Sequence, residues 1–188
     1  MRLSNLLNIF IFSTLSSYSA FCFGQYEDNP LKDKQWSSLT LGANTADNFS
    51  YQVLLSHSMR SETLITSFRL AYNQELFSAQ NDSVTSFKNK SVELGMMWGD
   101  GFGGEKWYMS INGGMGLNIR RYGDDVEDTT LVRKLTGVTI GVPVQLEAGA
   151  FVTDEWGILI CGVANWNFRQ PYVGATLGVV YRPKRKKK

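Results

Sequence analysis

The chain has a single histidine, His57, which stands between two serines in the segment LSHSM. A histidine hydrogen-bonded to a serine can activate the hydroxyl as a nucleophile. Residues around His57 alternate between polar and apolar types, which predicts a β-strand, and neighbouring residues of a strand point to opposite faces. Ser56 and Ser58 are therefore expected to face away from His57. We interpret the histidine as a rim residue with polar neighbours.

Two further segments resemble ligand-binding motifs. GDGFGG, residues 99–104, matches the glycine spacing of a dinucleotide-binding loop. That loop requires a following helix, whereas a strand pattern follows here, so we predict a flexible turn. The acidic run at Asp124, Asp125, Glu127 and Asp128 lacks the spacing of a calcium-binding loop and indicates a solvated loop. The sequence predicts no catalytic residue, cofactor or metal site.

The elements that carry these residues are strands. Alternation with a period of two recurs from Trp36 almost to the last residue and predicts eight strands. They are expected near residues 36–44, 49–59, 64–73, 91–99, 106–121, 136–151, 156–166 and 172–182. The seventh is apolar on both parities, so its phase stays open, and Pro143 predicts a bulge in the sixth. Sequential strands with mostly short links predict an all-β, antiparallel, up-and-down barrel.

The composition of the two strand faces indicates which one points outward. The non-apolar face consists mainly of Gly, Ser, Thr and Asn, with Arg69, Glu93, Arg120 and Glu147 as its few charges. Such small residues suit the narrow interior of an eight-stranded barrel, and the apolar face of the seven clearly phased strands carries no Asp, Glu, Lys or Arg. We therefore predict a transmembrane barrel. A soluble lipocalin-like barrel, with its apolar face inward, is the alternative.

Two sets of side chains follow from this orientation. Arg69 and Glu93 lie on neighbouring strands at similar heights and predict an ion pair that keeps the lumen closed. Trp156 and Trp166 share a parity ten residues apart, which corresponds to about 23 Å along the membrane normal, close to the expected apolar band of about 25 Å. The predicted aromatic girdle comprises Tyr72, Trp98, Trp107, Trp156, Trp166 and Tyr181.

The first residues have the layout of a secretory signal. Arg2 precedes an apolar core at Leu6–Leu15 that is too short for a membrane anchor, and a small, polar tail follows. Cleavage after Gly24 gives a signal peptide (1–24), an N-terminal periplasmic segment (25–35), a barrel (36–182) and a basic tail (183–188). Long links near 74–90 and 122–135 are expected on the outer side. The expected location is the outer membrane of a Gram-negative bacterium.

Charge is distributed unevenly. Residues 25–181 hold 12 basic and 17 acidic residues, a net charge of −5, whereas the segment RPKRKKK at 182–188 is strongly basic. On an exported chain this tail is interpreted as a solvated end that contacts lipid headgroups or polyanions, and no nucleic-acid partner is expected. The expected partner is the lipid bilayer. Cys161 is the only cysteine after the signal, so no internal disulfide can form.

Several segments resemble small outer-membrane barrels, and most of all the conjugal transfer protein TraO family of Bacteroidota. They are Gln25 after the signal, LTLGANTADNFSYQ, AYNQELF, VELGMMW, WYMSINGGMG, PVQLEAGAFVTDEWGILI and GVVYR. The resemblance implies a non-enzymatic component of a transfer apparatus, with other transfer-apparatus proteins as candidate partners, and it brings no catalytic residues. A passive structural or adhesive barrel, a lipid-modifying enzyme and a soluble ligand-binding barrel are the alternatives.

Overall fold

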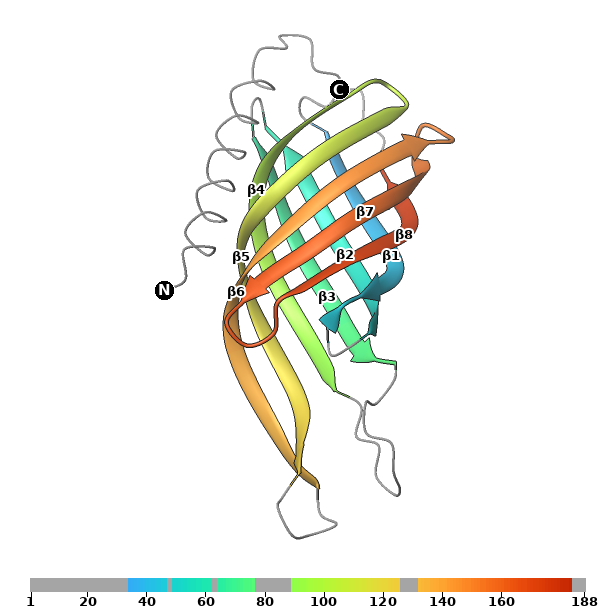
Figure 1. The fold of residues 1–188 in the computed structure, drawn as a ribbon. Coiled ribbons are helices and arrows are strands. Elements are labelled where there is room, and N and C mark those ends of the chain that lie inside the picture. The colour runs from blue at the N-terminus through green and yellow to red at the C-terminus, as the bar shows by residue number, and fades with distance from the viewer. Residues whose placement is uncertain (1–33, 47–48, 62–63, 77–88, 126–131, 184–188) are drawn as a thin grey trace, which may run out of the picture.

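The computed structural model describes residues 34–46, 49–61, 64–76, 89–125 and 132–183. They form a closed antiparallel barrel in which each strand pairs with the next and β1 pairs with β8 (Figure 1). The strands are β1 (Gln35–Asn44), β2 (Ser50–Arg60), β3 (Ile65–Glu75), β4 (Lys90–Gly103), β5 (Trp107–Asp125), β6 (Val132–Phe151), β7 (Trp156–Asn167) and β8 (Tyr172–Tyr181). This confirms the predicted all-β barrel. The signal segment and residues 184–188 lie outside the described residues.

The pairing register fixes the tilt of the strands. A circuit through paired, outward-facing residues starts at Trp156 and returns to β7 at Trp166, a displacement of ten residues. The residues passed on the way are Tyr181, Ser37, His57, Phe68, Met96, Met115 and Val142. Met115 and Val142 are placed opposite each other by the register on either side, Gly113 with Val144 and Gly116 with Gly141. Ten residues of about 3.3 Å against eight strand steps of about 4.8 Å give a tilt of about 40°. The circuit therefore climbs about 3 Å per strand and about 25 Å in all.

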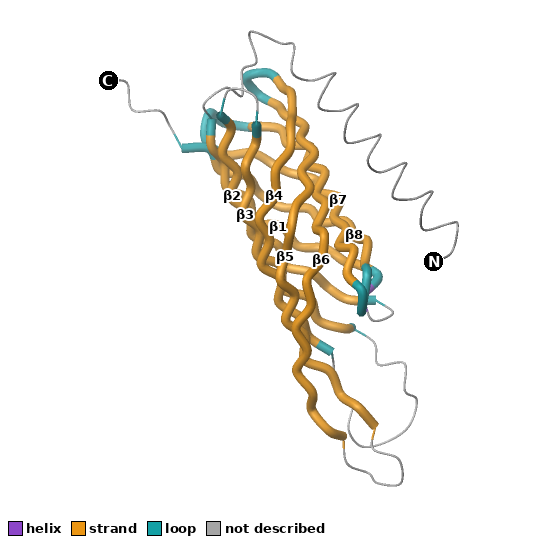
Figure 2. The backbone as a smooth tube through the Cα atoms, turned by 90° about the vertical axis from the view of Figure 1, so that its left-hand side faces the viewer, coloured by secondary structure: helices purple, strands orange, loops and turns teal. Residues whose placement is uncertain are grey.

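The two ends of the barrel differ. At the basal end, where β1 begins and β8 ends, the links are short and comprise residues 61–64, 104–106 and 152–155. At the opposite hairpin end, β5 and β6, of 19 and 20 residues, project beyond the other strands as one long hairpin (Figures 1 and 2). The link predicted at 122–135 is therefore largely paired strand. The backbone pairing continues beyond Arg121 although the polar–apolar alternation weakens there, so the pattern predicted strands that end too early.

The segment GDGFGG is mostly strand, so the predicted flexible turn is wrong. β4 continues to Gly103. A Cβ atom at Gly99 or Gly101 would collide with the backbone of β5, so these glycines allow two strands to approach closely. Asp100, between them, forms an ion pair with Arg60 at the end of β2, with 3.1 Å between Oδ1 and Nη2. The glycines thus serve close packing at the basal end.

Side chains of the small, polar parity face the interior, as predicted, and those of the apolar parity face outward. The phase of β7, which the sequence left open, is also defined. Leu159 and Cys161 are buried in the interior, whereas Ile158 and Ile160 are exposed on the outer wall. The interior therefore also contains apolar side chains, which is why both parities of β7 are apolar.

The predicted bulge at Pro143 is absent. Gly113 pairs with Val144 and Gly116 with Gly141, so the register is the same on both sides of the proline and no residue is inserted. The β5–β6 pairing is only interrupted there, because proline has no backbone N–H to donate. The ring of Pro143 points inward, where a Cβ atom at Gly116 would lie 3.4 Å from it.

Candidate functional site

Arg69 of β3 and Glu93 of β4 meet inside the barrel. Arg69 Nη2 lies 2.6 Å from Glu93 Oε1, and both side chains have zero exposure. The hydroxyl of Tyr172, on β8, accepts a hydrogen bond from Arg69 Nη2 at 2.8 Å and donates one to Glu93 Oε2 at 2.7 Å. Asn165 Nδ2 also donates to Glu93 Oε2. The buried charges are thus paired and hydrogen-bonded, which their removal from water requires.

A second interior carboxylate, Glu147 of β6, is held by neutral groups in the described part of the chain. Its Oε2 accepts from Trp36 Nε1 at 3.1 Å, the Tyr108 hydroxyl at 3.3 Å and Ser110 Oγ at 3.4 Å, and its Oε1 from Gln145 Nε2 at 2.6 Å and Ser56 Oγ at 3.3 Å. These donors belong to β1, β2, β5 and β6. Glu147 therefore connects four strands across the lumen, a role that its position on the polar parity did not reveal.

These two clusters close the lumen. Glu93 and Glu147 have zero exposure, and Arg69 and Tyr172 are also buried. Side chains therefore fill the interior between the two ends, as expected for an eight-stranded barrel of this diameter. In the described part of the barrel, the side chains accordingly leave no open aqueous channel.

Aromatic residues gather at two levels of the outer wall. The pairing register places the aromatic residues of the basal ring within about 3 Å of the height of Trp156 along the barrel axis. This ring comprises Trp107, Trp156 and Tyr181, and the ring centroids of Trp156 and Tyr181 are 4.8 Å apart. The upper ring lies about 25 Å above it. It comprises Tyr51, Tyr72 and Trp166, and the centroids of the two tyrosines are 6.1 Å apart.

Trp98 occupies a different level from the other five residues of the predicted girdle. It pairs with Gly113, whose row continues through Val144 to Ala164 of β7. This register places Trp98 about 11 Å above Trp156, near the middle of the wall. Its position near a predicted strand end reflected the early end assigned to β4, which in fact continues to Gly103.

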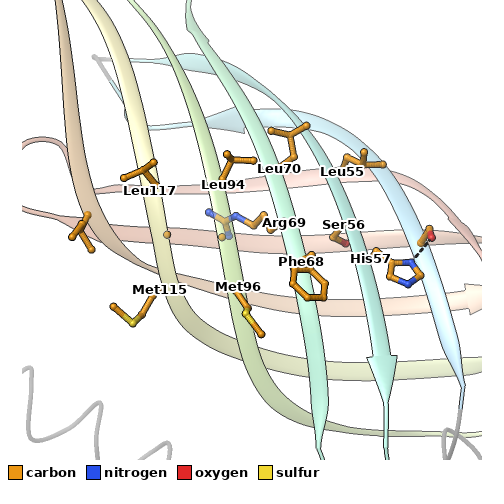
Figure 3. A pocket seen from close by; sticks show the side chains of 14 residues that line it. Leu55, Ser56, His57, Phe68, Arg69, Leu70, Leu94, Met96, Met115 and Leu117 are labelled. Atoms are coloured by element: carbon orange, nitrogen blue, oxygen red, sulfur yellow. Dashed lines mark hydrogen bonds between the residues drawn. The ribbon is translucent and has the colours of Figure 1, made fainter.

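A groove of about 690 Å³ runs diagonally over the outer wall between two rows of side chains (Figure 3). One row is Leu55, Leu70, Leu94, Leu117 and Ile140, and the other is Ser37, His57, Phe68, Met96 and Met115. The rows are two residues apart on each strand, or about 7 Å. That width suits an alkyl chain better than a helix, whose diameter is about 10 Å.

One end of the groove carries a serine–histidine pair. Ser37 Oγ and His57 Nδ1 share a hydrogen bond of 2.8 Å. Ser56 and Ser58 face the interior, away from His57, as expected, and the partner is a serine of the neighbouring strand β1 that the sequence did not single out. Directly opposed residues of adjacent strands share a face, and Ser37 is opposite His57.

This pair is incomplete as hydrolytic machinery. The groove lining includes no carboxylate that could orient the imidazole. Both residues lie within paired strand segments, so their backbone N–H groups belong to the sheet and form no oxyanion hole. The hydrogen bond satisfies Ser37 Oγ and His57 Nδ1 on an otherwise apolar wall.

The remaining candidate groups add no reactive site. Within the described ranges, no group of three His, Cys, Asp or Glu residues could hold a metal ion. Asp124 and Asp125 of the acidic run belong to β5, whereas Glu127 and Asp128 lie outside the described residues. Cys161 is free and buried. At the basal end, partial burial and the nearby Arg182 guanidinium lower the pKa of Lys34.

Comparison with known proteins supports the fold. No protein-family model matches the chain, and no curated protein matches its sequence. Ail, the attachment invasion locus protein of Yersinia pestis, superposes with a TM-score of 0.54 and 10% identity over 80% of this chain and 97% of that one. Ail also aligns in its complex with the heparin analogue sucrose octasulfate, with a TM-score of 0.53, 10% identity and coverage of 80% and 97%.

Two further solved structures are similar. Neisserial surface protein A (NspA) gives a TM-score of 0.54 and 12% identity over 81% of this chain and 96% of that one. A major outer membrane protein from Thermus thermophilus gives 0.54 and 13% over 79% and 99%. At such low identity the similarity establishes the fold: this chain is an eight-stranded barrel of the kind found in small outer-membrane proteins.

Proposed function

We propose that the protein is a non-enzymatic barrel that spans the outer membrane. The observation that carries this proposal is the distribution of apolar and charged side chains on the outer wall. Between the basal and upper rings, the exposed side chains are apolar, and the exposed charged residues of the described strands and turns lie at or beyond the rings. These are Lys90, Glu105, Lys106, Arg121, Asp154 and Arg169. The distance of about 25 Å between the rings equals the apolar band of such barrels.

Fractionation and heat modifiability test this location. We expect the mature protein in the outer-membrane fraction and a shift in gel mobility on boiling, because a closed barrel resists detergent until it is heated. Recovery of a soluble monomer without detergent would contradict the proposal and favour a lipocalin-like barrel.

For the cellular role we propose a component of a conjugal transfer apparatus, supported by the resemblance of the mature sequence to the TraO family. The closed lumen is compatible with a structural component that transports nothing itself. Deletion of the gene should lower the frequency of conjugation, and the wild-type gene should restore it. An unchanged frequency, in a strain where the protein is expressed, would reject this role.

Adhesion is the second candidate. The β5–β6 hairpin, which projects beyond the barrel, favours it, because such a projection presents backbone and side chains to a partner outside the membrane. Ail and NspA, whose names refer to attachment and to the cell surface, have the same fold. Shortening the hairpin to residues 122 and 135 should abolish cell or matrix binding while the barrel still assembles.

A further inference from the structure

A polar notch of about 290 Å³ lies at the hairpin end, on the inner side of the projecting strands. Its lining consists of Asn118 and Arg120 of β5, Gly137 and Thr139 of β6, Asn167 of β7, and Arg169 and Gln170 of the β7–β8 turn. The pairing of β6 with β7 ends at Gly141 and Asn167. Above that point, within the described residues, the edge of β6 that faces β7 has no strand partner, and the β7–β8 turn and the hairpin enclose a hollow.

The register places the notch outside the apolar wall. Arg120 is five residues beyond Met115 on β5, which places it about 6 Å above the level of Trp166. It has the inward parity of Asn118, whereas Arg121 is exposed on the outward face. A ligand would therefore reach the notch from the aqueous side.

The lining is electropositive. It contains two guanidinium groups, three amide side chains and one hydroxyl, and no carboxylate. Within the described part of the chain, the side chain of Arg169 makes no hydrogen bond or ion pair, and the buried Oγ1 of Thr139 has no hydrogen-bond partner. Planar guanidinium groups bind phosphate, sulfate and carboxylate oxygens through two parallel hydrogen bonds. These donors thus match an anionic ligand.

Asn167 holds the turn that presents Arg169. Its Oδ1 accepts hydrogen bonds from the backbone N–H of Arg169 at 3.1 Å and of Gln170 at 2.5 Å. Its Nδ2 donates to the carbonyl oxygen of Gln170 at 2.7 Å. The backbone at Arg169 is therefore fixed before any ligand arrives, which lowers the entropic cost of binding.

We propose that the notch binds a phosphate or sulfate ester carried by a sugar at the outer surface of the cell. Arg120 and Arg169 would bind the anionic oxygens, Thr139 would donate its hydroxyl, and the amides of Asn118 and Gln170 would contact sugar hydroxyls. The notch has the volume of about ten water molecules, more than a single ion requires. The site depends on the proposed function only in that the hairpin end faces outward.

Fluorescence anisotropy with a fluorescein-labelled heparin oligosaccharide tests the site on the full-length barrel in nanodiscs. We expect saturable binding that weakens with added salt. Arg169→Gln should raise Kd at least about tenfold, because a hydrogen bond between charged groups contributes about that factor. Arg120→Gln should act similarly, and Thr139→Val should raise Kd several-fold.

Arg121→Gln is the matched control for Arg120→Gln. It removes the same charge from the neighbouring residue, whose side chain is on the outward face of β5. It should change Kd by less than about twofold. Equal losses for Arg121→Gln and Arg169→Gln, or no saturable binding at all, would overturn the proposal. Arg169 is exposed, so its variant is expected to fold, and heat modifiability verifies this for each variant. If the protein is a heat-modifiable barrel in the outer membrane but binds no heparin, the proposed binding site is rejected. The proposed location in the outer membrane then still holds.

The same assay distinguishes the two sources of the ester. Nanodiscs with phosphorylated lipopolysaccharide should displace heparin, and those with dephosphorylated lipopolysaccharide should not, if the ligand belongs to the membrane. If neither displaces it, the ligand is a soluble or partner-cell glycan. In both cases the effect of Arg169→Gln must persist for the proposal to hold.

Discussion

An arginine on the outer wall should destabilise the barrel by an amount that depends on its height between the two aromatic rings. Leu55, Met115 and Val138 are 48%, 63% and 57% exposed, so all three lie on the outer surface of the barrel. By the register, Leu55 lies about 14 Å and Met115 about 19 Å above Trp156, and Val138 lies about 7 Å beyond the upper ring. The three positions therefore sample the middle, the upper part and the outside of the proposed hydrocarbon layer.

The cost follows from removing a guanidinium group from water. At the midplane of such a barrel an arginine costs about 2 to 4 kcal/mol, and near an interface about 0 to 1 kcal/mol. We therefore expect a loss of about 2 to 4 kcal/mol for Leu55→Arg, roughly 1 to 2 for Met115→Arg, and less than about 1 for Val138→Arg. The order of the three losses matters more than any single value.

These losses can be measured by reversible unfolding of the vesicle-embedded protein in denaturant. Tryptophan fluorescence follows the transition. The linear dependence of unfolding free energy on denaturant gives each difference. Three small and equal losses would refute the membrane reasoning, because in a soluble barrel all three outward positions would lie in water. A loss for Val138→Arg as large as that for Leu55→Arg would show that the height assignment is wrong.

Three further predictions concern the interior and the wall. Arg69→Met should cost about 3 to 5 kcal/mol of unfolding free energy by leaving the Glu93 charge buried and unpaired, and addition of Glu93→Gln should recover part of that loss in the same denaturant titration. Gly114→Ala should assemble poorly on a folding gel, because its Cβ would collide with the backbone of β4, whereas Gly116→Ala, with its nearest neighbour at 3.2 Å, should be tolerated. His57→Ala should leave lipid composition unchanged by mass spectrometry; loss of a modified lipid in that variant, with folding preserved, would make the barrel an enzyme.

The barrel architecture was predictable because its physical cause is local. A strand with one face toward apolar surroundings and the other toward a narrow lumen must alternate, and this period is visible in a single segment such as 106–121. Alternation disappears where that cause disappears. The tops of β5 and β6 extend beyond the apolar wall, and the alternation weakens there, so the pattern predicted these two strands too short. Both parities of β7 are apolar, which left its phase open.

The side-chain pairs were harder to predict, because they depend on contacts between strands. Arg69 and Glu93 could be paired since they lie on consecutive strands near a single link. Tyr172, which hydrogen-bonds to both, belongs to β8 and reaches them across the lumen. Ser37 lies opposite His57 only in one register of β1 against β2, and a shift of one residue would separate them. No local sequence signal contains that register.

Physical constraints divide the barrel into parts that differ in their freedom to acquire function. The outer wall must satisfy lipid, and the lumen must satisfy the buried charges of Glu93 and Glu147, so most substitutions there carry a stability cost. The hairpin end has neither constraint, because it extends beyond the apolar wall and the filled lumen. An unsatisfied hydroxyl at Thr139 and a side chain of Arg169 without a partner among the described residues occur at this end. The interior also holds polar atoms without a hydrogen-bond partner, such as Gln52 Oε1 and Gln145 Oε1, but side chains fill it. The notch leaves room for a ligand, and for that reason we place recognition there and not in the interior.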